Sequence, residues 1–382
     1  MVRSRTKEPE LSLVLDFGGS LTKGIYRGKS GEAMLFSMEP EVISLPKASI
    51  DEYEARKMGT PDPADAAWVG CGDDYYAVGY LASSQFYGNA GLSSFKYERA
   101  FPKTLAAVWA VAHRLGLTKK KKISAAIGVL LPAGEYENAS RLKELITEGL
   151  DNFSTPTGTM SVSLSHYESK PEGGGVLMVY ATSQDAAVLK SKTVAVVMVG
   201  YRNASILVSE RGVVGKRLTS PLGFIRLVEL VERRISTLVG TARLAAAIAR
   251  AGESIQTAPL MPLAMSSQKE SRLSEVEKLV GAIESSRDQY LHSLSSWLRE
   301  NLPKELDEVI LCGGTAYYLR DSLEKFFSSS CVEVVWDGDM ELPENLQTED
   351  LGRRMCDVYG MYRYFTSTMR ESKKVTLVAR ES

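Results

Sequence analysis

Short apolar runs, each ended by a turn, divide the first part of the chain into predicted strands. Leu11–Asp16 is mostly apolar and ends in an acid, which is typical of a buried strand. A turn of small residues, Phe17–Lys23, follows it, and Gly24–Gly28 is the expected hairpin partner. Ile123–Leu131 is a further buried strand, which Pro132 ends. These runs indicate a sheet whose strands are far apart in the sequence.

Apolar residues at helical spacing lie between and after these strands. Tyr97–Leu117 has the spacing of a buried helix, and Glu135–Leu150 is also predicted to be helical. The glycine-rich segment Glu172–Gly175 is typical of a flexible connector. We therefore expect Val176–Leu189 to carry a strand and then a helix that begins near Ser183.

The second half of the chain has the same order of elements. Thr193–Val199, Ala204–Ser209 and Val213–Leu218 are predicted strands joined by short turns that contain glycine. The segments expected after them are the helices Gly223–Ala251 and Glu270–Leu302, the strand Glu308–Leu311, and a final helix at Thr348–Phe365.

The two halves share a plan although their residues differ. Each opens with a strand, a glycine turn and a second strand, and the turns fall at residues 16–23 and 198–205. This repeat predicts an α/β protein of two similar lobes whose glycine turns line a cleft.

The composition excludes several classes of function for a protein with this predicted fold. The 382 residues include 46 Lys and Arg against 47 Asp and Glu, so the chain has no basic surplus with which to grip nucleic acid directly. Three His and four Cys residues lack the spacing of a zinc site or a disulfide scaffold. The N-terminus shows no signal peptide, and no apolar run could insert into a membrane. We expect a cytoplasmic protein.

The turn Asp16–Lys23 carries groups suited to phosphate and metal. An acid at a strand end can hold a water molecule on Mg²⁺, and the hydroxyls of Ser20 and Thr22 and the lysine can reach phosphate oxygens. The same residues also fit a plain hairpin turn with an incidental acid. Gly200–Asn203 and Cys312–Thr315 are two more glycine turns after strands, and three such turns together favour a nucleotide site.

These segments resemble the motifs of the actin-like ATPases of the bacterial ParM/StbA plasmid-segregation type. Asp16–Lys23 is similar to the first phosphate motif of that superfamily, Val196–Ile206 to the second, and Val309–Ala316 to the adenosine motif. Lys96–Ala100 and Leu351–Tyr362 also resemble segments of the family, so the likeness spans residues 11–365.

The resemblance implies two RNase H-like lobes with ATP and Mg²⁺ between them. It implies that Asp16 positions water on Mg²⁺. The implied nucleotide contacts are Gly18, Gly19, Ser20, Leu21, Thr22 and Lys23 in the first motif, Gly200, Tyr201, Arg202 and Asn203 in the second, and Gly313, Gly314 and Thr315 in the third. The implied parts are a flexible tail at residues 1–10, lobe I at 11–192 with an insertion around 29–80, lobe II at 193–345, and a segment at 346–382 whose helix returns to lobe I before a frayed tail.

Two departures from the family pattern bear on hydrolysis. Met198 and Ser205 stand where the second motif has its leading and trailing acids, and methionine cannot order water on Mg²⁺. In the family, the side chain that activates the attacking water lies at the start of the helix before this motif. Here Gln184 is the first candidate for that role and Asp185 is the second. Hydrolysis is therefore expected to be slow, or absent with binding retained.

The resemblance implies a protein that polymerises with itself into filaments. Its role would be plasmid or DNA segregation through an adaptor that binds DNA, or a derived cytoskeletal role in cell shape, and the neutral charge agrees with an adaptor touching the DNA. Two alternatives are a soluble phosphotransferase of the same superfamily, such as a sugar kinase, and a nucleotide-gated scaffold with little hydrolysis.

Overall fold

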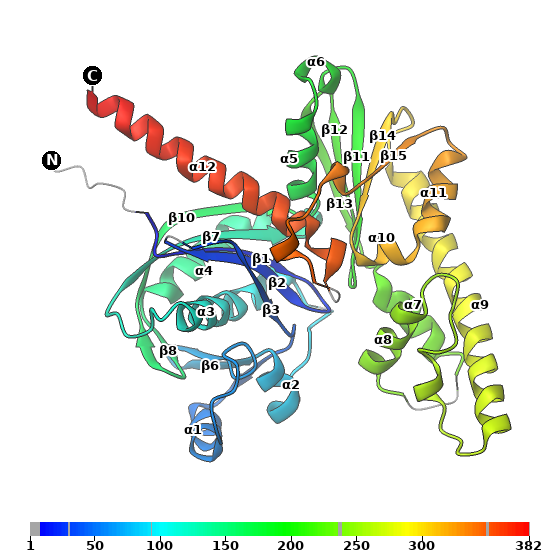
Figure 1. Cartoon of the computed structure of the whole chain (residues 1–382), viewed down its shortest axis with the longest axis horizontal. Coiled ribbons are helices and arrows are strands. Elements are labelled where there is room, and N and C mark those ends of the chain that lie inside the picture. The colour runs from blue at the N-terminus through cyan, green and yellow to red at the C-terminus, as the bar shows by residue number, and fades with distance from the viewer. Residues whose placement is uncertain (1–7, 30, 93, 236–238, 349–350, 382) are drawn as a thin grey trace. The chain divides into compact units, whose positions relative to one another are not determined.

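The structure is a computed structural model that describes residues 8–29, 31–92, 94–235, 239–348 and 351–381 (Figure 1). The chain forms two compact units, Met1–Val179 with Glu341–Ser382 (unit 1) and Tyr180–Met340 (unit 2). The lobe limits expected at 192–193 and 345–346 stay predictions, and residues 1–7 of the expected tail lie outside the described residues. Within the described residues, no helix has the length and apolar character needed to cross a membrane.

Unit 1 is built on a mixed five-stranded sheet with the order β10-β7-β1-β2-β3. Strands β1, β2 and β3 are antiparallel neighbours, whereas β7 runs parallel to β1 and β10 runs parallel to β7. The strands are β1 (Leu11–Phe17), β2 (Thr22–Gly28), β3 (Met34–Met38), β7 (Ile123–Leu131) and β10 (Val162–Pro171). The strand predicted at Ile123–Leu131 is confirmed to the residue.

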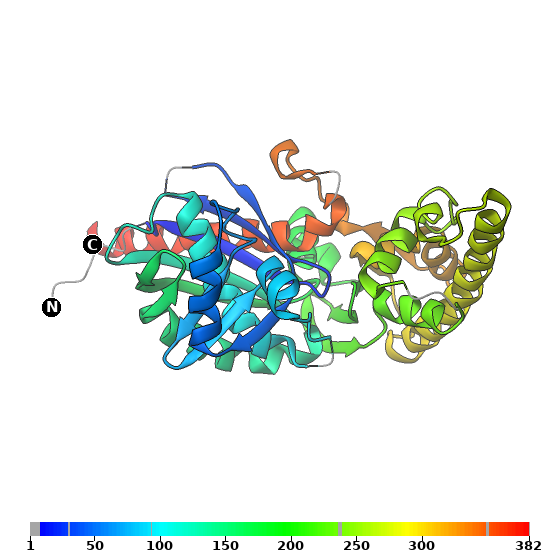
Figure 2. The same cartoon turned by 90° about the horizontal axis from the view of Figure 1, so that it is seen from below.

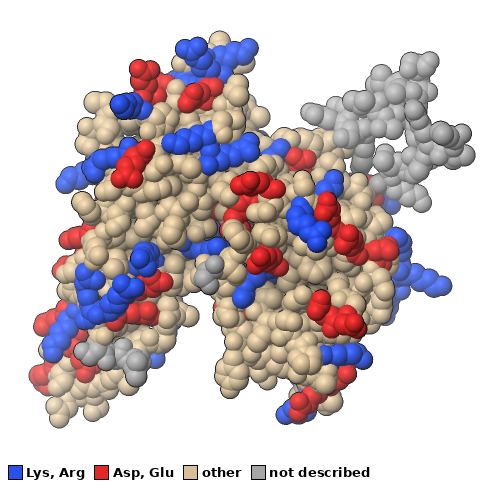
Figure 3. All heavy atoms as spheres, turned by 180° about the vertical axis from the view of Figure 1, so that it is seen from behind, with Lys and Arg blue, Asp and Glu red and all other residues tan. Residues whose placement is uncertain are grey.

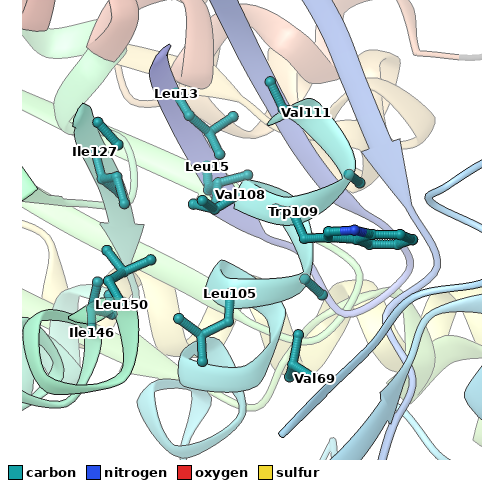
Figure 4. Packing of buried hydrophobic residues seen from close by; sticks show 14 of the residues in the cluster. Leu13, Leu15, Val69, Leu105, Val108, Trp109, Val111, Ile127, Ile146 and Leu150 are labelled. Atoms are coloured by element: carbon teal, nitrogen blue, oxygen red, sulfur yellow. The ribbon is translucent and has the colours of Figure 1, made fainter. Parts of the chain in front are cut away.

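Helices cover both faces of this sheet, so β1 is buried along its whole length. Leu13 and Leu15 pack against α3 in a core shown in Figure 4. On the other face, the glycine at position 128 leaves room for side chains of α12. Each fully buried leucine contributes roughly 1.5–3 kcal/mol to folding. The helices are α3 (Lys96–Arg114) and α4 (Ala139–Asp151) on one face and α12 (Cys356–Glu381) on the other.

The insertion expected around residues 29–80 contributes to a second sheet of unit 1, with the order β4-β6-β5-β8-β9. Its strands are β4 (Val42–Leu45), β5 (Trp68–Cys71), β6 (Asp74–Val78), β8 (Phe153–Thr155) and β9 (Gly158–Met160). Helices α1 (Lys47–Arg56) and α2 (Tyr80–Phe86) accompany them.

Unit 2 contains a sheet with the order β13-β12-β11-β14-β15, which repeats the plan of the large sheet of unit 1. Three antiparallel strands again come first in the sequence, and two parallel strands complete the sheet. The strands are β11 (Thr193–Val199), β12 (Ala204–Glu210), β13 (Val213–Ser220), β14 (Glu308–Cys312) and β15 (Glu333–Trp336). The repeat predicted from the glycine turns is therefore present in the fold.

Helices of unit 2 pack on the face of this sheet that carries Ala195, Val197 and Val199. Figure 2 shows α7 and α8 beside the long α9 in green and yellow. The segment predicted as one helix, Gly223–Ala251, contains two helices, and residues 236–238 of that prediction lie outside the described residues. The helices are α7 (Phe224–Glu232), α8 (Thr241–Ala251), α9 (Lys269–Asn301), α10 (Gly314–Tyr318) and α11 (Arg320–Ser328).

Two helix predictions need correction. Helix α5 (Gly174–Ser183) begins inside the expected flexible connector Glu172–Gly175 and takes the place of the strand expected from Val176, and it ends where a helix was expected to start; the short α6 (Ala186–Leu189) follows. Helix α12 continues well past Phe365, where the expected final helix ends, because no glycine or proline follows Gly360 to stop it. Residues 349–350 of that expected helix lie outside the described residues. The 3₁₀ segments are η1 (Ala133–Asn138), η2 (Met261–Leu263), η3 (Asp337–Asp339), η4 (Glu344–Leu346) and η5 (Gly352–Met355).

Candidate functional site

The turn between β1 and β2 is a tight loop in which glycine is required. A Cβ atom on Gly18 would lie 2.5 Å from the carbonyl oxygen of Leu21, so no side chain fits there without movement of the backbone. Antiparallel pairing places Asp16 directly opposite Lys23, at the two ends of the loop. The backbone of the loop therefore lies between the carboxylate of Asp16 and the ammonium of Lys23.

Asp16 is buried, with 2 % of its surface exposed, and two lysines neutralise it. The ammonium of Lys23 lies 2.8 Å from one carboxylate oxygen, and that of Lys96, at the start of α3, lies 3.3 Å from the other. Burial alone would raise the pKa of Asp16, but the two positive charges outweigh it and hold the pKa at about 2. Asp16 is thus a fixed negative charge at any physiological pH.

Glu172 completes this buried group, and the sequence analysis did not identify it as a site residue. It follows the last residue of β10, Pro171, and pairs with the ammonium of Lys96. Burial raises the pKa of Glu172, the charge of Lys96 opposes this, and the negative charge of Asp16 raises it further. The signal in the sequence was an acid directly after a strand and before glycines, the same signature that identified Asp16.

A third carboxyl group holds the turn that carries Glu172. Asp357, in the first turn of α12, accepts hydrogen bonds from the backbone N–H groups of Gly173 (2.8 Å) and Val176 (3.2 Å). These N–H groups lie at the start of α5, where backbone donors have no partner within the helix. Burial raises the pKa of Asp357 to about 7, the two backbone donors oppose the shift, and the charges of Asp16 and Glu172 add to it.

Gln184 and Asp185, the predicted water-activating candidates, have other surroundings. Helix α5 ends at Ser183 and the short α6 begins at Ala186, so the two residues lie between these helices, and their role in activating water stays a prediction. The side chain of Asp185 caps α6 by accepting from the backbone N–H of Ala187 at 2.7 Å. The only hydrogen bond described for the side chain of Gln184 is a long one, 3.5 Å, to the hydroxyl of Ser183. In the chain, Glu172 precedes α5 and Gln184 follows it.

In unit 2, the structure brings two of the predicted glycine turns together. The hydroxyl of Thr315 donates to the carbonyl oxygen of Gly200 at 2.8 Å, which links the third motif to the second. Gly313 has a φ of +97°, and a Cβ atom there would lie 2.5 Å from the carbonyl oxygen of Val199. Backbone N–H groups at the start of α7 donate to the carbonyls of residues 200–202. These turns are closely packed.

Met198 occupies in unit 2 the position that Asp16 occupies in unit 1. Both are the sixth residue of the first strand of their sheet, and each lies opposite the second residue of the second strand, Ser205 in unit 2 and Lys23 in unit 1. Met198 is buried, with 8 % of its surface exposed. The acid is therefore replaced by a buried apolar side chain within an otherwise repeated framework.

The residues around Asp16 fit a phosphate chain with a hard cation. The hydroxyl of Thr22 is fully buried and has no hydrogen-bond partner among the described residues, which leaves it able to bond to a water molecule or a ligand. No three His, Cys, Asp or Glu side chains of the described residues form a metal cluster. A Mg²⁺ ion held here would take most of its oxygen ligands from phosphate and water, as Mg²⁺ commonly does.

Comparison with known proteins gives the fold and not the family. No protein-family model matches the sequence, and no curated protein matches it. Solved structures do match. The actin-like protein Alp7A has a TM-score of 0.63 at 14 % identity, with 97 % of this chain and 99 % of that chain covered. A ParM from Clostridium botulinum, solved as a 15-stranded filament, has a TM-score of 0.59 at 14 % identity and 94 % and 99 % coverage.

An archaeal actin homologue, Ta0583, also matches, with a TM-score of 0.57 at 17 % identity and with 94 % of this chain and 99 % of that chain covered. These likenesses extend over nearly the whole chain, so the fold is that of an actin-like protein, as the sequence motifs predict.

Proposed function

We propose that this chain is a nucleotide-binding, actin-like protein that polymerises into filaments. The observation that carries the proposal is the buried group of Asp16, Lys23, Lys96 and Glu172 behind a glycine loop, in a fold shared with a ParM solved as a filament. A buried ion network of this kind is costly to desolvate, so its presence at a strand end favours a functional site.

ATP with Mg²⁺ is the proposed ligand. Gly18–Lys23 would bind the phosphates, and Asp16 would orient water on the cation, because its low pKa keeps it ionised. Bound Mg²⁺ would supply the positive charge that neutralises the terminal phosphates. In unit 2, Gly200–Asn203 and Gly313–Thr315 are the proposed nucleotide contacts of the second and third motifs, and Met198 leaves the second motif without its leading acid.

Glu172 is the residue that we propose as the acceptor of the proton from the attacking water, in place of Gln184 and Asp185. Its carboxylate shares Lys96 with Asp16, so the chain brings the metal-orienting acid and a second carboxylate to one ammonium group. A carboxylate whose pKa is raised by burial accepts a proton more readily than an exposed one. The turn at Asp357 holds it in place.

Phosphate release from ATP tests this assignment. Glu172→Gln keeps the shape and an acceptor for Lys96 but cannot take up a proton, so release is expected to fall by about 10²- to 10⁴-fold. Nucleotide affinity should change by less than about threefold, since the phosphate loop is intact. Gln184→Ala is the matched control, and we expect it to release phosphate like the unaltered chain. The reverse pattern, with Gln184→Ala inactive and Glu172→Gln active, would restore the first assignment.

The role proposed for the filaments is to move DNA through an adaptor protein, or a derived role in cell shape. On the face shown in Figure 3, Lys and Arg side chains are interspersed with Asp and Glu side chains. Together with a net charge of -1, this supports an adaptor at the DNA. Filaments mixed with double-stranded DNA at physiological salt should leave its electrophoretic mobility unchanged. A retarded band in the absence of any second protein would contradict this part of the proposal.

A further inference from the structure

Helix α3 contacts strands of both sheets of unit 1. Strands β1 and β5 both pack on it in the core of Figure 4, where Leu15 and Val69 are labelled. Residues 39–41, here called the linker, join β3 of the large sheet to β4 of the second sheet. Arg99 of α3 donates to the carbonyl oxygen of Val42, the first residue of β4, at 3.1 Å. Helix α3 therefore holds the start of the second sheet.

Lys103 is a buried cation on the same side of α3 as Lys96 and Arg99, because intervals of three and four residues bring side chains together on a helix. Only 3 % of its surface is exposed, and its ammonium group has no hydrogen bond or ion pair with another described residue. Burial lowers the pKa of Lys103 to about 7. The charges of Lys96 and Arg99 add to this shift, and those of Glu41 in the linker and Asp16 on β1 oppose it.

Glu41 is the acid of the linker that acts on Lys103. One of its carboxylate oxygens, Oε2, is buried and has no hydrogen-bond partner among the described residues. Burial raises the pKa of Glu41, its own backbone N–H opposes the shift, Glu39 adds to it, and Lys103 opposes it. The carbonyl of Glu41 accepts from the N–H of Gly79 at 2.9 Å, so its backbone is attached to the second sheet. Glu39 accepts from the hydroxyl of Ser83 at 2.9 Å.

An acid and a base that are buried and attract each other without forming an ion pair are costly to desolvate, and such groups are typical of functional sites. Negative charge at the phosphate loop would change their state. Asp16, at the start of the loop, already attracts Lys103, and the phosphates of a nucleotide would add to this attraction. Lys103 would then keep its proton, and its positive charge would attract Glu41 more strongly.

We propose that Lys103 and Glu41 form a latch, which closes into an ion pair when the phosphates of a nucleotide occupy the loop and so fixes the linker to α3. This inference rests on the proposed function, because it names a consequence of nucleotide binding at the same loop. The latch carries the presence of phosphate along α3 to the second sheet.

Binding of ATP with Mg²⁺ to the full chain and its variants tests the latch. Glu41→Gln keeps the shape of the side chain and should weaken ATP about 3- to 30-fold, as expected when one coupled ion pair is lost. Combined with Lys103→Met, which removes the partner, Glu41→Gln should change the affinity by less than about 1.5-fold. Glu39→Gln in the same linker is the matched control and should change the affinity by less than about twofold, since Glu39 bonds to Ser83.

The pH dependence of binding separates Lys103 from Asp357. Burial raises the pKa of Asp357 to about 7 and the charges of Asp16 and Glu172 add to the shift, so this group also responds to negative charge. The measurement is therefore made in Asp357→Asn. There, the ATP affinity with Lys103, divided by that with Lys103→Met, should fall as pH rises through about 7, because Lys103 must then take up a proton. A ratio that does not change with pH would overturn the inference.

Hydrogen exchange reports on the linker directly. The N–H of Gly79 donates to the carbonyl of Glu41, so ATP should slow its exchange in the unaltered chain and not in Glu41→Gln. An equal effect of Glu41→Gln on affinity with and without Lys103, or no effect with Lys103 present, would overturn the inference alone. Failure of the unaltered chain to bind ATP would overturn the proposed function, and this inference with it. Melting temperatures of the variants that are no lower than that of the unaltered chain would exclude unfolding as the cause of a loss.

Discussion

Asp16, Glu172 and Asp357 are three buried carboxyl groups whose pKa values shift differently because their partners differ. Two lysines hold the pKa of Asp16 at about 2, whereas Asp357 has only backbone donors and its pKa is raised to about 7. Charge partners therefore decide which acid stays ionised. Near neutral pH, Asp357 exchanges its proton while still accepting hydrogen bonds at the start of α5.

The raised pKa of Asp357 predicts a pH dependence of stability. The folded protein keeps a proton that the unfolded chain, with a pKa of 3.8, has lost, so this residue lowers stability as pH rises from 3.8 to about 7 and adds no slope above that. Asp357→Asn removes the titration. The variant should therefore gain stability relative to the unaltered chain as pH rises. The difference between their free energies of unfolding, variant minus unaltered chain, should be about 3 kcal/mol larger at pH 8 than at pH 5. Urea unfolding without nucleotide measures this, and a difference that does not change with pH would refute it.

The role of a residue could be predicted from the sequence only where a motif lay at the clear end of a predicted strand or helix. Asp16 ends a mostly apolar run, which marked the end of the strand, and the structure places it beside Lys23. Glu172 follows β10, in which half-buried residues predominate, and it precedes three glycines that are also typical of a flexible linker. Its partner Lys96 is 76 residues away, and no local pattern encodes such a pairing.

At the scale of elements, glycines allow α5 and α12 to approach each other closely. A Cβ atom on Gly360 would overlap the carbonyl group of Gly175, and one on Gly175 would overlap the backbone of Asp357. This contact brings the carboxyl of Asp357 within reach of the first turn of α5. Glycines that are typical of a flexible connector in the sequence are therefore part of a tightly packed junction.

Addition of one methyl group at this junction should be costly. Gly360→Ala forces two backbones apart, so we expect a loss of roughly 1–3 kcal/mol in the free energy of unfolding. Gly281→Ala in α9 is the matched control, since a Cβ atom there meets nothing within 4 Å, and it should stabilise the protein by up to about 1 kcal/mol. Thermal unfolding of the two variants compares them. Equal effects would show that the helices do not meet closely.

Elements buried on both faces were predicted best. The strands Ile123–Leu131 and Thr193–Val199 were predicted to the residue, because each is a mostly apolar run with a clear end. Helix α5 was misread because its first residues are glycines and Val176–Ala181 is a continuous apolar run, so the segment shows no helical period. Helix α12 was predicted too short because its later residues carry no apolar stripe that would mark a buried face.

At the scale of the whole molecule, one plan of strands is used twice, with different chemistry at equivalent positions. The sixth residue of the first strand is an acid in unit 1 and Met198 in unit 2. The copy in unit 1 thus carries the buried ion network, and the copy in unit 2 carries tightly packed glycine turns. On this account, binding of nucleotide is retained with one acid fewer, and hydrolysis depends on Glu172.

Sedimentation of the purified chain with and without nucleotide tests the central claim most directly. With ATP and Mg²⁺ at high micromolar protein concentration, the chain should pellet, and electron microscopy of the pellet should show filaments. A non-hydrolysable ATP analogue should give filaments that persist, and without nucleotide the protein should stay in the supernatant. A chain that stays monomeric under every nucleotide condition would contradict the account.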